Sequence, residues 1–248
     1  MSHWEDPIDF KKVAADGIVA IIAKATQGAT GVDPAYAEFK RAAGAVRLPS
    51  TPLSRRSLVR RRINQRLARG AVLSTNNFLL GSYHFGTGAD VNPQVEHYLA
   101  TVKPKDNELV CLDFEENPSG SSMTLSQAKK FVSLFKQRTG RYPILYGGAW
   151  LKENLNGKPD PILSKCALWL SQYGPKPVLP PGWKKYVLWQ YTDGQLDVAP
   201  HEVNAVGSCD RNQFAGTIQR LTACMAVWPR LSDGLKPFRW DGASYGKE

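Results

Sequence analysis

Acidic residues are missing from one long span of the sequence. No Asp or Glu occurs between Phe39 and Ala89. Eight arginines fall inside a shorter part of that span, residues 47–69: Arg47, Arg55, Arg56, Arg60, Arg61, Arg62, Arg66 and Arg69. Without these eight charges the formal net charge of +10 would fall to +2. The basic character is therefore local, and it does not by itself indicate a protein that binds nucleic acid or membranes over its whole surface.

Aromatic residues are also missing between Arg47 and Asn77. A dense arginine run can engage the phosphates of a nucleic acid or another anionic surface, which leaves such binding open as a function of this span. Without aromatic side chains to stack on bases, we expect no specific nucleic-acid partner. The apolar run that begins at Phe78 follows naturally from Gly44, so we interpret residues 45–77 as a basic, disordered insertion in a helix-to-strand connection.

Cysteine is scarce, and long hydrophobic runs are absent. The four cysteines form no C-x-x-C pair and do not cluster with His, so we expect no metal site and no cofactor. Cys111 and Cys166 lie in apolar runs, which indicates buried free thiols, whereas a bridge between Cys209 and Cys224 remains an alternative. No run is long enough to span a membrane, and the amino terminus lacks the pattern of a signal peptide.

What the sequence does contain is an alternation of apolar strand-like runs and amphipathic helical segments. The expected strands are 18–23, 78–85, 110–116, 142–147, 167–170 and 186–191, and the expected helices are 8–17, 34–44, 93–102, 125–138 and 150–155. The segment Lys24 to Gly28 reads as a polar loop, and no clear helix separates the last two strands. This pattern predicts a parallel sheet, and the number of elements suits an α/β barrel over residues 1–216. Residues 217–248 show no periodicity and are interpreted as a tail of unknown role.

Two carboxylates end the third of these strands. Asp113 and Glu115 stand at i and i+2, so strand alternation places them on the same side. A pair of acids facing one cleft is the usual equipment for cleaving a glycosidic bond. The alternative is an ordinary strand end whose acids meet solvent or a neighbouring Lys.

Other predicted strands also end in polar or aromatic residues. In a parallel α/β barrel these carboxyl-terminal ends share the face on which loops build the active site. The residues in question are Tyr83, His84, Tyr146, Trp169, Gln190 and Tyr191. Aromatic faces stack on sugar rings, so a cleft of Trp, Tyr and carboxylates fits a sugar polymer, although each aromatic taken alone could equally be a core or rim residue.

Eight short motifs occur along the chain from Ser2 to about Gly216. They are Ser2-His3-Trp4, Lys24-Ala25-Thr26-Gln27-Gly28, Gly81-Ser82-Tyr83-His84-Phe85, Leu112-Asp113-Phe114-Glu115, Pro143-Ile144-Leu145-Tyr146, Leu168-Trp169-Leu170, Trp189-Gln190-Tyr191-Thr192 and Asp210-Arg211-Asn212-Gln213-Phe214. In these motifs and in their order the chain resembles glycoside hydrolase family 25, the Chalaropsis-type lysozymes or N-acetylmuramidases.

The resemblance implies a modified (β/α) barrel with fewer helices than a TIM barrel and hydrolysis of the β-1,4 bond after N-acetylmuramic acid in peptidoglycan. Glu115 matches the family's general acid and Asp113 its neighbouring carboxylate. The matching substrate-binding positions are Tyr83, Tyr146, Trp169, Trp189 and Asp210. Two mechanisms stay open: attack by the substrate's own 2-acetamido group, oriented by Asp113, or direct displacement by water.

The match departs from the family pattern in two places. The family's first strand carries D-x-S-x-x-Q, whereas only Met1 precedes Ser2, so we expect a truncated first strand without that Asp. The family often has Glu where this chain has Gln27. These departures leave a non-catalytic cell-wall or glycan-binding barrel as the alternative to a monomeric muramidase acting on the cell wall or outside the cell.

Overall fold

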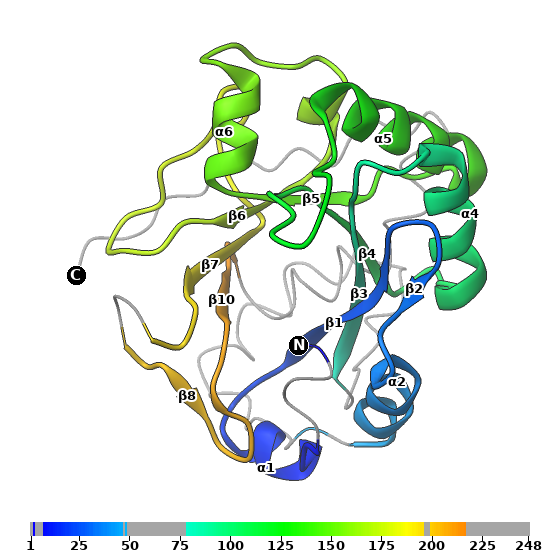
Figure 1. Cartoon of the computed structure of the whole chain (residues 1–248). Helices are drawn as coiled ribbons and strands as arrows, with labels where there is room; N and C mark the ends of the chain where they lie inside the picture. Colours follow the sequence, from blue (N-terminus) through cyan, green and yellow to red (C-terminus); the bar gives the residue numbers. More distant parts are fainter. Residues whose placement is uncertain (1, 3–6, 47, 49–77, 196–198, 217–248) are drawn as a thin grey trace, which may run out of the picture.

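The protein folds around one curled sheet, seen in a computed structural model that describes residues 2, 7–46, 48, 78–195 and 199–216. The sheet has the strand order β10-β7-β6-β5-β4-β3-β1-β2 (Figure 1). The strands are β1 (Ala20–Gln27), β2 (Gly31–Val32), β3 (Leu79–Phe85), β4 (Leu109–Asp113), β5 (Ile144–Gly147), β6 (Leu168–Ser171), β7 (Leu188–Thr192) and β10 (Arg211–Phe214). The strands from β1 through β7 in this order pair in parallel, whereas β2 and β10 pair antiparallel at the two edges. The predicted modified barrel is confirmed.

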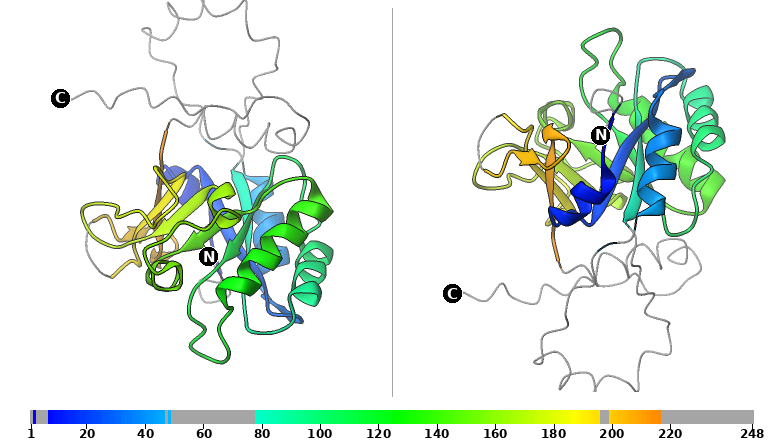
Figure 2. Two further views of the ribbon diagram at one scale, coloured as in Figure 1. Left: turned by 90° about the horizontal axis from the view of Figure 1, so that it is seen from above. Right: turned by 90° about the horizontal axis from the view of Figure 1, so that it is seen from below.

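The helices pack on the outer side of this sheet (Figure 2). They are α1 (Phe10–Ala15), α2 (Tyr36–Ala45), α4 (Val91–Val102), α5 (Leu125–Thr139) and α6 (Ala149–Leu155), with a 3-10 turn η2 (Leu163–Lys165). Helix α5 begins with the predicted capping box of Thr124 and Gln127 and stops at Gly140, whose φ of 73° favours glycine. As expected, no helix lies between β6 and β7, where every residue is described. A small hairpin, β8 (Glu202–Val203) with β9 (Gly207–Ser208), lies outside the main sheet.

The prediction of a polar loop at Lys24 to Gly28 is wrong. Strand β1 continues through Gln27 because both of its edges are paired there, Gln27 with Phe85 of β3 and Thr26 with Val32 of β2. A register shift between Lys24 and Thr26 marks a bulge that lets this polar stretch stay in the sheet.

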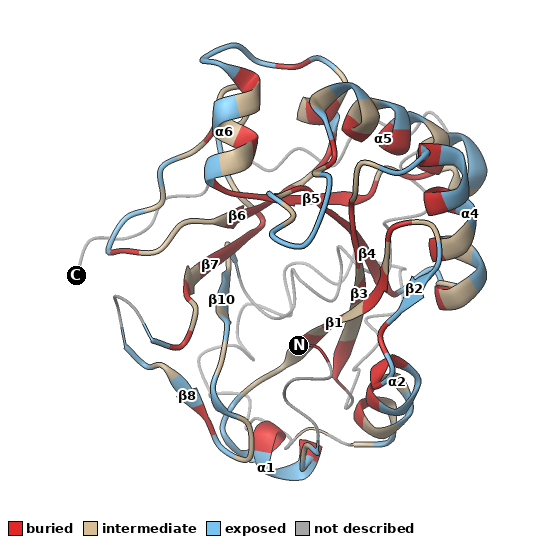
Figure 3. Cartoon of the chain, in the orientation of Figure 1, coloured by how far each residue is buried: buried red, intermediate tan, exposed pale blue. Residues whose placement is uncertain are grey.

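Buried residues follow most strands of the sheet (Figure 3), and their side chains form two apolar clusters. The outer cluster joins the sheet to the helices and contains large buried side chains such as Phe39, Tyr98, Phe131 and Phe135. The inner cluster fills the hollow of the curl. Its buried members are Leu79, Leu109, Cys111, Ile144, Tyr146, Trp169, Val187 and Leu188. Residues of one strand alternate between the two clusters, as the side-chain period of a strand requires.

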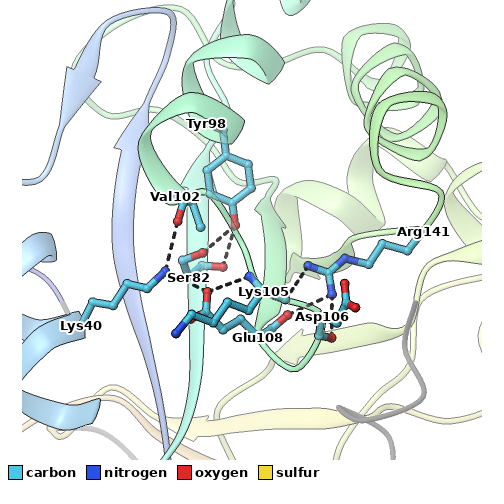
Figure 4. A network of polar contacts seen from close by, with 8 residues as sticks. All are labelled: Lys40, Ser82, Tyr98, Val102, Lys105, Asp106, Glu108 and Arg141. Atoms are coloured by element: carbon cyan, nitrogen blue, oxygen red, sulfur yellow. Dashed lines mark hydrogen bonds and ion pairs between the residues drawn. The ribbon is translucent and has the colours of Figure 1, made fainter. Parts of the chain in front are cut away.

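A network of polar contacts lies at the amino-terminal end of β4, called the lower end below; the carboxyl-terminal end, at Asp113, is the upper end (Figure 4). Lys40 Nζ lies 2.8 Å from Glu108 Oε2 and 3.1 Å from the carbonyl oxygen of Val102. The buried guanidinium of Arg141 donates to the carbonyl oxygens of Lys105, Asp106 and Glu108 at 3.2 to 3.3 Å. The turn before β4 is thereby bound both to α2, through Lys40, and to the segment before β5, through Arg141.

Three further expectations concern the cysteines, the basic insertion with the tail, and the amino terminus. Cys111 and Cys166 are buried free thiols, as predicted. Cys224, the tail from residue 217 and most of the basic insertion at 45–77 lie outside the described residues, so a bridge to Cys209 and the disorder of the insertion stay predictions. Ser2 is buried, but most residues around it are likewise not described. None of the helices described here has the length and apolar character needed to cross a membrane.

Candidate active site

A row of paired residues crosses the inner face of the sheet at the height of the predicted carboxylates. Each member is the register partner of the next on the neighbouring strand. The row runs Gln27, Phe85, Asp113, Tyr146, Trp169 and Leu188, from β1 to β7. One acid, one amide and three aromatic rings are therefore set side by side by backbone pairing alone.

Asp113 and Glu115 face one cleft of about 390 Å³ on this inner side. Strand β4 ends at Asp113, and Glu115 follows in the loop, half-buried. Between them the Phe114 side chain is fully buried in the outer cluster, and its amide donates to the Tyr146 carbonyl oxygen at 3.0 Å. This anchor turns the two flanking carboxyl groups toward the cleft, so the predicted shared face is found although the strand stops earlier than expected.

Asp113 occupies an unusual environment for a carboxyl group. Its side chain is 5% exposed, and Oδ1 is buried without a hydrogen-bond partner, the one such side-chain atom among the described residues. Burial, followed by the charge of Glu115, raises its pKa well above the ordinary value. Buried polar atoms are normally satisfied, so an unpaired oxygen in a residue that lines the cleft makes Asp113 a candidate for contact with a ligand.

Glu115 also holds its proton more tightly than an ordinary carboxyl group. Burial, and then the negative charge of Asp210, raises its pKa to about 7. Lys24 acts on both Asp113 and Glu115 in the opposite direction. A carboxyl group that is largely protonated below neutral pH can donate a proton to a leaving oxygen.

Aromatic side chains form one wall of the cleft and are held by polar contacts. The rings of Tyr146 and Trp169 meet edge to face at 4.8 Å, and Tyr83 approaches Trp169 at 6.4 Å. The Tyr146 hydroxyl donates to Gln190 Oε1 at 2.6 Å, and the Trp169 indole donates to Asn212 Oδ1 at 2.6 Å. These bonds fix rings whose faces can accept a sugar.

Trp189 does not line this cleft, contrary to the prediction for that residue. It belongs to the outer cluster, packs against Tyr186 at 5.9 Å and donates its indole N–H to the Gln172 carbonyl oxygen. Its neighbours Leu188 and Gln190 face the cleft instead, because alternate residues of β7 point to opposite sides. The other predicted positions come together, since Tyr83, Tyr146, Trp169, Asp113, Glu115 and Asp210 all line the cleft.

The structure also places Gln190 and Asn212 at the cleft. The position of Gln190 at a strand end indicates this face from the sequence, whereas Asn212 occurs only within a motif quoted above and was not selected. Asn212 gave no such signal, because β10 is a short polar strand that carries no apolar period. No group of three or more His, Cys, Asp or Glu side chains within the described ranges could hold a metal ion.

Comparison with known proteins identifies the family of the chain. The model of the family "Glycosyl hydrolases family 25" matches residues 61–197, more than half of the 248 residues. Lysozyme M1 of Streptomyces globisporus is 25% identical over 239 residues, covering 90% of this chain and 69% of that protein.

Solved structures show the same fold. A bacterial lysozyme from Streptomyces coelicolor matches with a TM-score of 0.69 at 22% identity, over 91% of this chain and 94% of that one. A family GH25 lysozyme from Aspergillus fumigatus matches with a TM-score of 0.65 at 22% identity, over 91% and 95%. The modular Cpl-1 endolysin, solved with a peptidoglycan analogue, matches with a TM-score of 0.53 at 16% identity, over 86% of this chain and 52% of that one. With more than half of its sequence matched by the family model, this chain belongs to glycosyl hydrolase family 25.

Proposed function

We propose that this chain is a muramidase of the lysozyme type, which hydrolyses the β-1,4 bond after N-acetylmuramic acid in the glycan strands of peptidoglycan. The observation that carries the proposal is the pair of unlike carboxyl groups at one cleft. Asp113 is buried with an unpaired oxygen, and Glu115 has a pKa near 7. Family membership and a structural neighbour solved with a peptidoglycan analogue support the same substrate class.

In this proposal Glu115 is the general acid. It donates its proton to the glycosidic oxygen as the bond to the anomeric carbon breaks, and the leaving sugar departs as an alcohol. Asp113 is the neighbouring carboxylate, whose free oxygen accepts a hydrogen bond from the substrate. If the 2-acetamido group attacks, Asp113 accepts its N–H and stabilises the developing positive charge. If water attacks directly, the same carboxylate takes the water's proton.

The cleft wall supplies the sugar contacts. We propose that Tyr83, Tyr146 and Trp169 pack against sugar rings and that Asp210, an exposed residue of the cleft lining, accepts hydrogen bonds from sugar hydroxyls. Because Gln190 and Asn212 hold two of these rings, little side-chain entropy is lost when the glycan binds. Such a protein would act on the cell wall or outside the cell.

The test is the release of reducing ends from a purified cell-wall suspension, followed together with the clearing of the suspension. We expect Glu115→Gln to lower the rate by about 10²- to 10⁴-fold, the usual contribution of a general acid. Glu116→Gln is the matched control, since Glu116 is exposed and follows in the chain. Equal rates for wild type and Glu115→Gln would remove Glu115 from the acid role.

Two measurements separate the remaining alternatives. Binding of a peptidoglycan saccharide with no release of reducing ends by the wild type would instead identify a non-catalytic glycan-binding barrel. Where turnover is seen, the anomeric form of the fresh product distinguishes the two routes. Retention indicates attack by the acetamido group, and inversion indicates attack by water.

A further inference from the structure

Lys24 is a basic side chain on the inner face of β1, beside the acids of the cleft. Its neighbours two and four residues back, Ile22 and Ala20, pack against the inner cluster, whereas Ile21 and Ala23 belong to the outer one, so alternation turns Lys24 to the inner side. Its ammonium group lies 2.7 Å from Gln27 Oε1 and 5.1 Å from the centroid of the Phe85 ring. One hydrogen bond and one cation–π contact therefore fix where this charge sits.

Phe85 links Lys24 to the catalytic strand, because the register partner of Phe85 on β4 is Asp113. Lys24 itself pairs with Tyr83, whose own partner on β4 is Cys111. The ammonium group is therefore held over a ring that stands next to the buried carboxyl group. Gln27, which is neutral, holds this charge without cancelling it.

The other charged and titratable groups around the two carboxyls are mostly acidic or neutral. The groups that face them are Glu115 and Asp210 among the acids, Cys111, Tyr83, Tyr146 and Tyr173 among the neutral groups, and Arg211 on the rim. The guanidinium of Arg211 donates to the Glu202 carbonyl oxygen, and Lys24 is the cation that lowers the pKa of both Asp113 and Glu115.

We infer that Lys24 is a positioning residue for the proposed reaction: its ammonium group, held by Gln27 and by Phe85, the register partner of Asp113, favours the ionised form of the carboxyl groups at the cleft. Two acids at one cleft titrate as a coupled pair, and a nearby cation stabilises the negative charge that they carry. The inference rests on the proposed muramidase function for its catalytic meaning. Its electrostatic content does not, because the charge acts on the carboxyls whether or not a substrate is turned over.

The first experiment compares pH profiles of kcat/KM for hydrolysis by the wild type, Lys24→Met, Lys24→Arg and Gln27→Glu. Lys24→Met removes the cation with little change in shape. Without it both carboxyls hold their protons more tightly, so we expect both limbs of the profile to move to higher pH by about 0.5 to 1 unit. Gln27→Glu places a negative charge against the ammonium group and should move the limbs in the same direction by a smaller amount.

Two variants separate charge from structure. Lys24→Arg keeps the charge and should restore the limbs to their wild-type pH even where it lowers the maximal rate. Lys158→Met removes a charge from an exposed loop position and should leave the profile unchanged. A uniform loss of rate in Lys24→Met, with both limbs in place, would show a merely structural role and overturn the inference.

A second readout needs no activity. The unfolding midpoint in urea is measured from pH 4 to pH 8 for the wild type, Lys24→Met and Lys158→Met. Acids whose pKa is raised by folding lose stability as the pH rises, so the loss across this range should be larger in Lys24→Met than in the other two. The same loss in all three proteins would overturn the inference even if the enzyme is active. A larger loss in an enzyme without hydrolase activity would uphold the inference and refute the proposed function.

Discussion

The two ends of β4 carry acids in opposite environments. At the lower, amino-terminal end, Glu108 is buried, and its carboxylate accepts hydrogen bonds from Lys40 at 2.8 Å and from the Lys105 amide at 3.2 Å (Figure 4). At the upper end, Asp113 is equally buried, but one of its oxygens has no partner, and its nearest charged neighbours include Glu115. The five-residue strand β4 therefore has, at one end, an acid whose carboxylate is hydrogen-bonded and, at the other, an acid with one oxygen that has no partner.

This difference separates what holds the fold from what the site can do. A buried charge that is paired and hydrogen-bonded is tolerated in the interior, whereas clustered acids without enough donors shift toward their protonated forms. Such groups reduce stability at neutral pH, and they are found where chemistry needs a proton held near pH 7. We therefore expect the protein to lose stability when a bonding partner is removed at the lower end of β4. It should gain stability when a charge is removed at the upper end.

The largest effect should follow from Arg141→Met at the lower end. The buried guanidinium donates to three carbonyl oxygens, and its loss leaves them without their partner in the interior. We expect the free energy of unfolding to fall by about 3 kcal/mol, measured by urea denaturation. Arg138→Met is the control, because Arg138 forms an exposed ion pair with Glu96 and should change stability by less than about 1 kcal/mol. Equal effects of the two substitutions would show that the buried contacts of Arg141 contribute no more to stability than an exposed ion pair.

The second-largest change in stability should follow from Glu115→Gln, and it should have the opposite sign. Folding raises the pKa of Glu115 from its ordinary value near 4.5 to about 7, so the folded protein binds this proton more tightly than the unfolded chain. Stability is therefore lost as the pH rises through that window. Gln cannot ionise, so at pH 8 the variant should be more stable than the wild type by on the order of 2 kcal/mol, with partial exposure allowed for, and at pH 4 the two should unfold alike. Thermal or urea unfolding at both pH values measures this.

The same chemical change at the other end of the strand serves as the contrast. Glu108→Gln removes the carboxylate that pairs with Lys40, so it should destabilise the fold at pH 8 by about 1 kcal/mol. If both substitutions destabilise the protein at pH 8, the acids at the two ends are not in opposite environments.

The sequence was enough to predict most elements of the fold and the acidic pair. Apolar runs marked the strands, and the capping box with Gly140 marked α5 because each of these signals is local. The family motifs then indicated the roles of Asp113 and Glu115. What they could not supply is the environment, because the unpaired oxygen of Asp113 depends on which side chains the neighbouring strands bring to its level.

Strand parity explains the residues that were misplaced or overlooked. In β7 the apolar residues Leu188 and Trp189 are adjacent, so nothing in the sequence shows which one faces inward. The polar segment around Lys24 predicts a loop, although pairing on both edges keeps that segment in the sheet. Parity and edge pairing are long-range properties, and they appear only when the register of the whole sheet is known.

The smallest effect should come from Asp210→Asn, on the exposed rim of the cleft. The charge of Asp210 raises the pKa of Glu115, and its removal should allow Glu115 to lose its proton at a lower pH. The alkaline limb of the kcat/KM profile should therefore move to lower pH by about 0.5 unit, since solvent screens an exposed charge. Asp193→Asn is the matched control, because Asp193 acts on Tyr173 and not on Glu115. This shift is opposite in sign to that expected for Lys24→Met. Finding both shifts would show that the opposing charges of Asp210 and Lys24 together determine the pKa of Glu115. A limb that stays in place in Asp210→Asn would mean that burial alone holds the proton on Glu115.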